Sequence, residues 1–216
     1  MINAVVFDLD GVLVDSETVW DDVREALVRE RGGRWHDKAQ AEMMGMSSPE
    51  WSRYMHEELA LPEPPEEING EVVRRILVRY RDDLPLIEGA VAAVERLAAA
   101  FTLALASSSN RPLIDAVLET AGLTARFSAT VSSEEVARGK PAPDVFLEAA
   151  QRLSVEPDVC AAIEDSSNGL RAARAAGMRV VALPNAHYPP EADALALADV
   201  VVASLDELTP ERIRGY

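Results

Sequence analysis

Ala4-Val5-Val6-Phe7-Asp8-Leu9-Asp10-Gly11, near the N-terminus, is the stretch that decides the fold. Its consecutive apolar residues lack the alternation of a half-exposed strand, so they predict a short β-strand buried on both faces. Side chains alternate along an extended chain, so Asp8 and Asp10 are expected to point the same way at the strand's end. Two adjacent carboxylates repel unless a cation lies between them. The pattern predicts a cation site, although alone it also fits a strand that ends in an acidic turn.

Further apolar runs of the same kind predict a sheet, with helical patterns between them. Strands that alternate with helices indicate a parallel, doubly wound sheet of the Rossmann-like α/β class, with helices on both faces. The predicted strands after the first are 102–106, 129–131, 159–163, 179–183 and 199–203. The predicted helices between them are 90–99, 112–121, 144–153 and 168–176.

One long stretch interrupts this alternation. Residues 15–84 contain helical periodicity and turn signals but no convincing strand. We therefore predict a small all-α domain, residues 15–84, inserted after the first strand into an α/β core domain made of residues 1–14 and 85–216. Pro85 and Gly89 mark the expected return to the core.

Composition excludes several classes of function. A net charge of −16 argues against nucleic acids and anionic membranes as partners, because both require a basic face. No apolar run approaches the roughly 20 residues of a membrane helix. The single cysteine, Cys160, lies in an apolar run and suits a reducing compartment. We expect a cytoplasmic protein, with a monomer as the default.

Three more polar motifs follow predicted strands or stiff loops. Ser107-Ser108-Ser109-Asn110 closes a strand and opens a helix, a pattern typical of an anion cradle and equally of a helix N-cap. Gly139-Lys140-Pro141-Ala142-Pro143-Asp144 presents one of only two lysines on a proline-stiffened loop. Ile163-Glu164-Asp165-Ser166-Ser167-Asn168-Gly169 places adjacent carboxylates where they either bind a hard cation or cap a helix. Carboxyl ends of parallel strands meet at one sheet edge, so these motifs are expected to converge.

Together, in this order, the four motifs resemble the haloacid dehalogenase superfamily of phosphohydrolases. The resemblance covers essentially the whole chain. It implies that Asp8 is the nucleophile, that Asp10 is the general acid and base, and that Lys140 offsets charge on the nucleophile and the phosphoryl oxygens. It further implies a phosphate site at Ser107, with Ser108 and Asn110 beside it. A magnesium site is implied at Asp165, with Glu164 directly or through water, completed by Asp8 and the Asp10 carbonyl.

The helical insertion is similar to the family's cap, which closes over the site and selects the substrate. Its opening, 14–21, and the segment 203–209 resemble the branch of sugar-phosphate phosphatases related to β-phosphoglucomutase. The resemblance implies a small phosphate ester, a sugar or polyol phosphate, as the substrate. Glu17, Met46 and Ser47 are the candidate substrate contacts in the cap, while Met43 and Met44 are expected to fill its core.

Three alternatives remain at this point. A β-phosphoglucomutase-like mutase has the same core, but that branch carries a histidine where this chain has Trp20, which favours a phosphatase. A true dehalogenase needs neither Asp10 nor the Glu164-Asp165 pair. A phospho-receiver, which accepts phosphate without turnover, needs about half this length and no cap.

Overall fold

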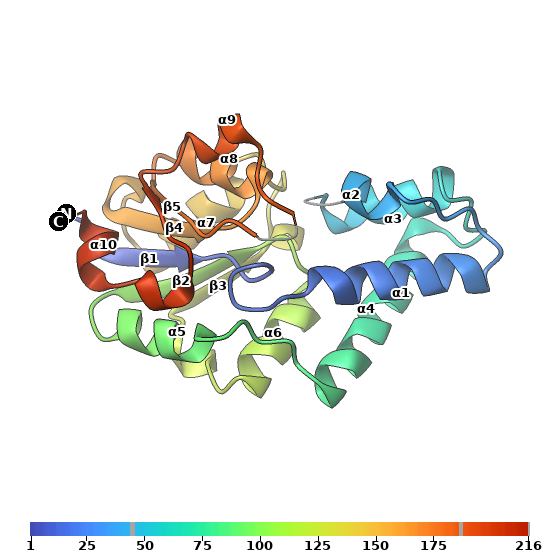
Figure 1. Ribbon diagram of the computed structural model, residues 1–216, viewed down its shortest axis with the longest axis horizontal. Coiled ribbons are helices and arrows are strands. Elements are labelled where there is room, and N and C mark those ends of the chain that lie inside the picture. The colour runs from blue at the N-terminus through green and yellow to red at the C-terminus, as the bar shows by residue number, and fades with distance from the viewer. Residues whose placement is uncertain (44–45, 186–187, 216) are drawn as a thin grey trace.

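The computed structural model describes residues 1–43, 46–185 and 188–215. A parallel sheet and its covering helices form one part of the molecule, and the helical insertion projects from it (Figure 1). Over these described ranges the sheet has six strands, in the order β3-β2-β1-β4-β5-β6. The strands are β1 (Ala4–Phe7), β2 (Thr102–Ser107), β3 (Ala129–Ser132), β4 (Cys160–Glu164), β5 (Arg179–Ala182) and β6 (Val200–Val201).

Alternate residues of β1 lie on opposite faces of the sheet, and each face has its own core. Val5 and Phe7 pack in the larger core, which includes Leu113 of α6 (Arg111–Thr120). Ala4 and Val6 pack on the other face. The helices that contribute residues to these two cores outside the insertion are α5 (Ala90–Ala98), α6 and α10 (Pro210–Arg214) on the first face, and α7 (Asp144–Leu153), α8 (Ser167–Ala175) and α9 (Ala192–Leu195) on the second.

These contacts confirm the predicted α/β class and the apolar runs that define it. The last strand is shorter than the predicted 199–203: β6 lies at the edge of the sheet, where it pairs with β5 over two residue pairs. Among the described residues, no helix combines the length and hydropathy needed to cross a membrane.

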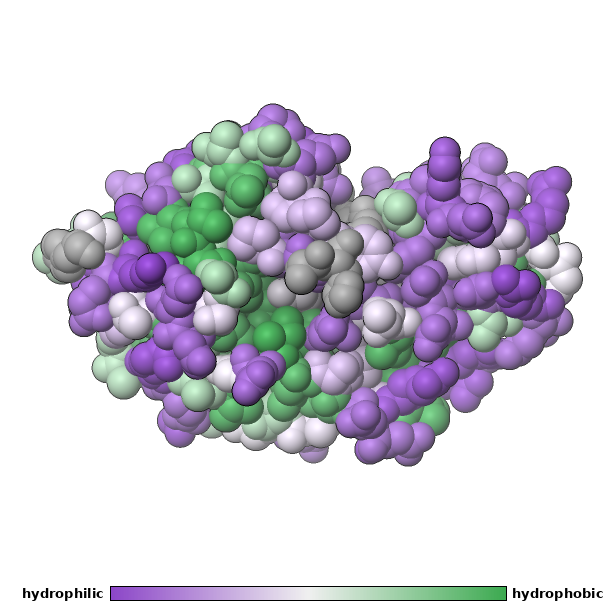
Figure 2. Space-filling view, viewed as in Figure 1, coloured by the Kyte–Doolittle hydropathy of each residue, from purple (hydrophilic) through white to green (hydrophobic). Residues whose placement is uncertain are grey.

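In the residues that the structure describes, the insertion contains four helices between β1 and α5. They are α1 (Glu17–Glu30), α2 (Ala39–Met43), α3 (Ser48–Glu57) and α4 (Pro65–Asp82). Trp20 and Trp51 pack edge to face inside it, with ring centroids 5.8 Å apart, and Met43 is buried as expected. Met44 lies outside the described residues. The space-filling view shows a mostly hydrophilic surface on this part of the molecule (Figure 2).

Two chain segments join the insertion to the sheet, and they run side by side. The Asp15 amide donates to the Pro85 carbonyl at 2.8 Å, and the Ile87 amide donates to the Leu13 carbonyl at 3.0 Å. Both connections therefore leave the core at one place, beside the carboxyl end of β1. A separate cap domain of residues 15–84 stays a proposal, and this arrangement supports it.

Candidate active site

The predicted site begins at the carboxyl ends of three neighbouring strands. Asp8 follows β1, Ser107 ends β2 and Glu164 ends β4. Phe7 lies opposite Leu105 on one side and Ile163 on the other. Residues about 100 and 155 positions apart in sequence therefore meet at one edge of the sheet, where open α/β proteins bind their ligands.

Lys140 links the two buried carboxylates of this edge. Its Nζ donates to Asp8 Oδ1 at 2.7 Å, to Glu164 Oε1 at 2.5 Å and to the Ala106 carbonyl at 3.2 Å. All three donors of the ammonium are thus used, and the side chain is only 4% exposed. The Lys140-Pro141 peptide is cis. The position of Lys140 is therefore fixed by contacts from three strand ends.

Glu164 is completely buried, and protein donors occupy both of its carboxylate oxygens. Oε1 accepts from Lys140, while Oε2 accepts from the backbone amides of Asp165 and Ser166 at 3.0 Å each and from the Ser166 hydroxyl at 3.1 Å. Gly169, in α8, makes room for this carboxylate: a Cβ at that position would lie 1.8 Å from Glu164 Cδ. A side chain at residue 169 would displace Glu164.

Among the described residues, three hydroxyl groups hold the carboxylate of Asp10. Oδ1 accepts from Ser16 Oγ at 2.5 Å, and Oδ2 accepts from Ser109 Oγ at 2.6 Å and, more weakly, from Ser107 Oγ at 3.3 Å. Ser16 precedes α1, whereas Ser107 and Ser109 lie at the end of β2. The orientation of the Asp10 carboxyl group therefore depends on both the core and the start of the insertion.

Carboxylate oxygens of Asp8, Glu164 and Asp165 lie within 4.8 Å of one another, a spacing that suits a bound metal ion. In the described part of the chain, the Asp165 side chain has no hydrogen-bond donor, although only 5% of the residue is exposed. Gly11 approaches it closely with φ +75°, and a Cβ there would lie 1.9 Å from Asp165 Oδ2. Buried oxygen ligands of this kind fit a hard cation such as Mg²⁺ or Ca²⁺.

Without such a cation the site has an excess of negative charge. Burial raises the pKa of Asp8 to about 8; repulsion from Glu164 and Asp10 adds to it, and attraction to Lys140 opposes it only in part. Burial and repulsion from Glu164 and Asp8 also raise the pKa of Asp165. Burial tends to lower the pKa of Lys140, but attraction to Asp8 and Glu164 outweighs burial and raises it. One ammonium does not balance these carboxylates, so a cation would stabilise their ionised forms.

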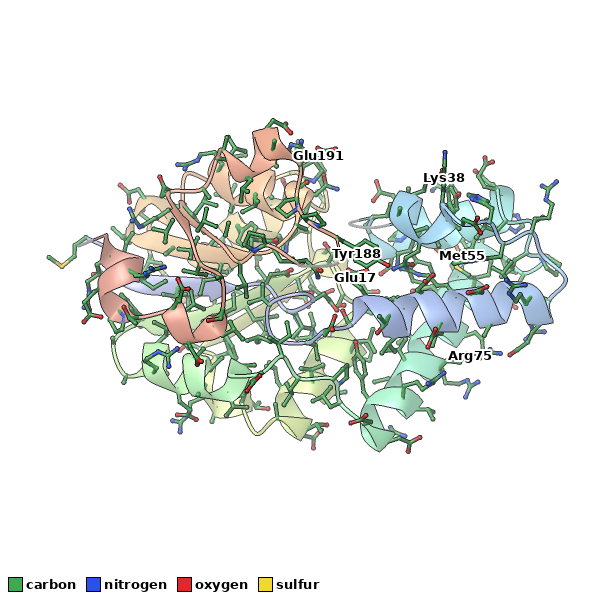
Figure 3. All side chains as sticks on the ribbon, viewed as in Figure 1. Glu17, Lys38, Met55, Arg75, Tyr188 and Glu191 are labelled. Carbon is green, nitrogen blue, oxygen red and sulfur yellow. The ribbon has the colours of Figure 1, made fainter. Side chains whose placement is uncertain are left out.

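A cavity of about 400 Å³ opens above Asp8 and Asp10, between the core and the insertion. Glu17 lies at this junction, and so does Tyr188, which comes from the segment after β5 (Figure 3). The other lining side chains come from both parts of the molecule. From the core they include Ser108, Ser109, Lys140, Asp165 and Arg171, and from the insertion they include Trp20, Arg24, Met43, Met46 and Trp51.

Comparison with known proteins decides the family. Residues 2–177 match the family model described as haloacid dehalogenase-like hydrolase. The chain belongs to the haloacid dehalogenase-like hydrolases. The resemblance drawn from the four motifs is thereby confirmed, and so is the prediction that the protein is an enzyme of the hydrolase class.

Its relatives in this hydrolase family include phosphatases. Hexitol phosphatase B of Escherichia coli K12 is 32% identical over 220 residues, which covers 99% of this chain and 97% of the relative. The bifunctional riboflavin kinase/FMN phosphatase of Arabidopsis thaliana is 32% identical over 212 residues, 97% of this chain but 55% of the relative. The chain thus spans about half the length of that relative. The crystal structure of CbbY from Rhodobacter sphaeroides in complex with phosphate has a TM-score of 0.86 and 26% identity, covering 99% of this chain and 100% of that one.

The fold brings most of the predicted site residues of this hydrolase together. Asp8, Asp10, Lys140 and Asp165 line the cavity, as do Ser108 from the core and Glu17 and Met46 from the insertion. Ser107 contacts Asp10 beneath them. Glu164 lies behind Lys140 rather than at the cavity wall.

Two predicted substrate contacts lie elsewhere among the described residues. Ser47 precedes α3, and its amide and hydroxyl both donate to Glu50 Oε2, at 2.7 and 2.6 Å. Asn110 joins the core to the insertion: it donates to Glu134 at 2.7 Å and Asn69 at 3.2 Å and accepts from Ser48 at 3.0 Å. Neither residue lines the cavity. The structure therefore gives no support for a substrate contact by either side chain.

Sequence reasoning missed four residues of the site. Ser109 is part of the quoted serine motif, but only its contact with Asp10 distinguishes it from its neighbours. Ser16 directly precedes α1, and only the folded structure shows that its hydroxyl donates to Asp10. Arg24 and Gln40 interact across 16 positions of the insertion, and no local pattern in the sequence indicated that contact.

Proposed function

We propose that the protein is a magnesium-dependent phosphatase that hydrolyses a small sugar or polyol phosphate monoester through an aspartyl-phosphate on Asp8. The observation that carries the proposal is the contact of the buried Lys140 ammonium with Asp8 beside the acidic cluster, at the base of a cavity large enough for a small ester. The phosphatases among its relatives support the reaction class.

Asp8 is the proposed nucleophile because its carboxylate lines the cavity and needs no base to remove a proton once ionised. One carboxylate oxygen attacks phosphorus, and the bond from phosphorus to the ester oxygen breaks. Lys140 stabilises the charge that develops on the transferring phosphoryl group. A bound Mg²⁺ supplies further positive charge at the same place.

Asp10 is the proposed proton donor to the leaving alkoxide, and it then accepts a proton from the water that hydrolyses the aspartyl-phosphate. Both steps require its carboxyl group in a fixed orientation at the cavity wall. The hydrogen bonds from Ser16 and Ser109 provide that orientation. Because Ser16 directly precedes α1, movement of the insertion relative to the core would change the position of Asp10.

The two acidic residues after β4 have different proposed roles. Asp165 has no donor among the described residues and lies against Gly11, so it would hold the Mg²⁺ together with Asp8. The Glu164 oxygens already accept from Lys140 and from the start of α8. Direct ligation by Glu164 would compete with these buried hydrogen bonds. We therefore assign Glu164 the role of orienting Lys140.

The insertion favours hydrolysis over a mutase reaction. At the position where the mutase branch carries a histidine, Trp20 packs against Trp51 and Arg24 and has no group that transfers protons near neutral pH. Interconversion of sugar phosphates without release of inorganic phosphate would reverse this assignment.

The experiment that tests the function measures phosphate release from sugar, polyol and nucleotide monophosphates, with Mg²⁺ or with a chelator. The purified protein and its Asp8→Asn variant are compared. We expect turnover that requires both Mg²⁺ and Asp8. Absence of release from every ester, with the protein folded and Mg²⁺ present, would refute a general phosphatase.

A further inference from the structure

Arg24 is a buried arginine on the wall of the cavity with few partners. The residue is 5% exposed, and its guanidinium lies 4.5 Å from the ring centroid of Trp20 and 4.8 Å from that of Trp51. A guanidinium has five N–H donors. In the described part of the chain, Arg24 forms one hydrogen bond, from Nη1 to Gln40 at 3.2 Å, and no ion pair, and its Nε has no partner. Donors buried without partners are costly, and a bound ligand is one way to satisfy them.

Gln40 connects Arg24 to a second polar side chain of the cavity. Its Oε1 accepts from Arg24, and its Nε2 donates to Glu17 Oε2 at 3.0 Å. Glu17 and Arg24 both line the cavity, and Gln40 itself is 95% buried, since only 5% of it is exposed. The Gln40 amide therefore positions the Glu17 carboxylate, an acceptor, and the Arg24 guanidinium, a donor, on the same wall of the cavity.

The charges around this wall decide what kind of ligand it suits. Arg24 carries one positive charge, and Glu17, Asp10 and Asp21 act on it as the nearby negative charges. A second anionic group on the substrate would approach Arg24 in the field of these carboxylates. Hydroxyl groups carry no charge and both donate and accept hydrogen bonds, so they match an arginine beside a carboxylate.

We propose that Glu17 and Arg24, positioned by Gln40, form a specificity site for neighbouring hydroxyl groups on the uncharged tail of the substrate. This inference rests on the proposed phosphatase function and narrows it: the substrate is a monophosphate with a polyhydroxylated, uncharged tail. A tail that carries a carboxylate or a second phosphate is disfavoured. Trp20 and Trp51 also line the cavity and add apolar surface beside these polar groups.

The test compares three kinds of substrate by their kcat/KM values. Sorbitol 6-phosphate represents the hydroxylated neutral tail. Fructose 1,6-bisphosphate and 6-phosphogluconate represent tails with a second anionic group. p-Nitrophenyl phosphate has no tail hydroxyl groups and reports phosphatase chemistry independently of the proposed site.

The variants Arg24→Met and Glu17→Gln each remove one member of the site while keeping its approximate volume. We expect each to lower the ratio of kcat/KM for sorbitol 6-phosphate to that for p-nitrophenyl phosphate by about 10- to 100-fold, as for the loss of a hydrogen bond to a charged group. Gln40→Leu should lower the same ratio, because the two side chains then lose their bridge. Arg29→Met, on the exposed side of the same helix, is the matched control and should leave the ratio unchanged.

Each outcome bears on the inference. If kcat/KM is higher for the two substrates with anionic tails than for sorbitol 6-phosphate, and this preference is lost in Arg24→Met, the site binds an anionic group rather than hydroxyl groups. An unchanged ratio in folded Arg24→Met and Glu17→Gln would overturn the inference while leaving the phosphatase intact. Absence of p-nitrophenyl phosphate hydrolysis by the unmodified protein would refute the phosphatase itself, and the inference with it. If Arg24→Met does not fold, Glu17→Gln alone decides.

Discussion

Lys140 Nζ lies 2.5 Å from Glu164 Oε1, and both side chains are buried although they come from different segments of the chain. The same ammonium contacts Asp8, so Glu164 determines where the positive charge lies relative to the proposed nucleophile. Electrostatic stabilisation is effective when such charges are fixed before the reaction begins. This contact separates the role of Glu164 from that of its neighbour Asp165.

Replacement of Glu164 and Asp165 should have different consequences. In Glu164→Gln, Lys140 loses a charged partner, and we expect kcat to fall by about 10²- to 10³-fold with little change in Mg²⁺ affinity. In Asp165→Asn, Mg²⁺ affinity itself should fall by roughly 10-fold or more, since a ligand charge is lost. Mg²⁺ titrations followed by activity and by thermal stability distinguish the two. Equal weakening of Mg²⁺ binding in both variants would mean that Glu164 is a ligand.

Stability should depend on pH and on Mg²⁺ through Asp8 and Asp165. A carboxyl group whose pKa is raised on folding stabilises the protein fully below its unfolded pKa, about 3.9, and loses that contribution as pH rises through its folded pKa, about 8 for Asp8. The raised pKa of Lys140 does not change the stability in this window, because the stabilisation from Lys140 is lost only when the pH rises above the usual pKa of a lysine. Without Mg²⁺, the melting temperature should therefore fall between about pH 5 and pH 9.

Mg²⁺ binds the ionised carboxylates, so it should raise the melting temperature more at pH 8.5 than at pH 6. Thermal unfolding with Mg²⁺ or chelator across this range measures both effects. Asp8→Asn should weaken the dependence on pH. A stability that rises toward pH 9 without metal would contradict the raised pKa of Asp8.

Gly11 should be required for metal binding and not only for the turn. In Gly11→Ala, the methyl group meets Asp165 Oδ2 and the residue keeps a positive φ. Gly122→Ala is the matched control, with φ +69° and open space around the added methyl group. Both variants should lose about 1–2 kcal/mol of unfolding free energy from backbone strain. Only Gly11→Ala should also lose Mg²⁺-dependent stabilisation and activity.

Ser109 should matter for the chemical step through Asp10. Ser109→Ala removes the 2.6 Å hydrogen bond to Asp10 Oδ2, and we expect kcat to fall about 10-fold with a smaller change in KM, because orientation rather than binding is lost. Ser108→Ala provides the comparison, since Ser108 lines the cavity but, in the described part of the chain, forms no hydrogen bond with Asp10. A larger effect on KM than on kcat in Ser109→Ala would indicate a direct contact with substrate instead.

The fold was predictable because its strands are buried on both faces. Burial of that kind produces the continuous apolar runs from which the sheet was predicted, and the motifs at the strand ends follow directly from them.

The parts that were not predictable depend on contacts between distant segments. Asn110 lies in a typical phosphate-binding motif, but its side chain forms hydrogen bonds with Asn69 and Ser48 of the insertion instead. In the sequence, Arg24 is part of an ordinary amphipathic pattern. Only the folded structure shows that Gln40 and the two tryptophans surround it.

The most direct test of the central claim is detection of the phosphate group on Asp8. The Asp10→Asn variant lacks the base that hydrolyses the intermediate, so incubation with Mg²⁺ and an activated ester such as p-nitrophenyl phosphate, followed by acid quenching, should trap it. Intact-mass measurement should show one added phosphoryl group, and peptide mapping after borohydride reduction should place it at Asp8. Turnover of the same ester by the unmodified protein, with no trapped phosphoryl group or with one on another residue, would contradict the mechanism.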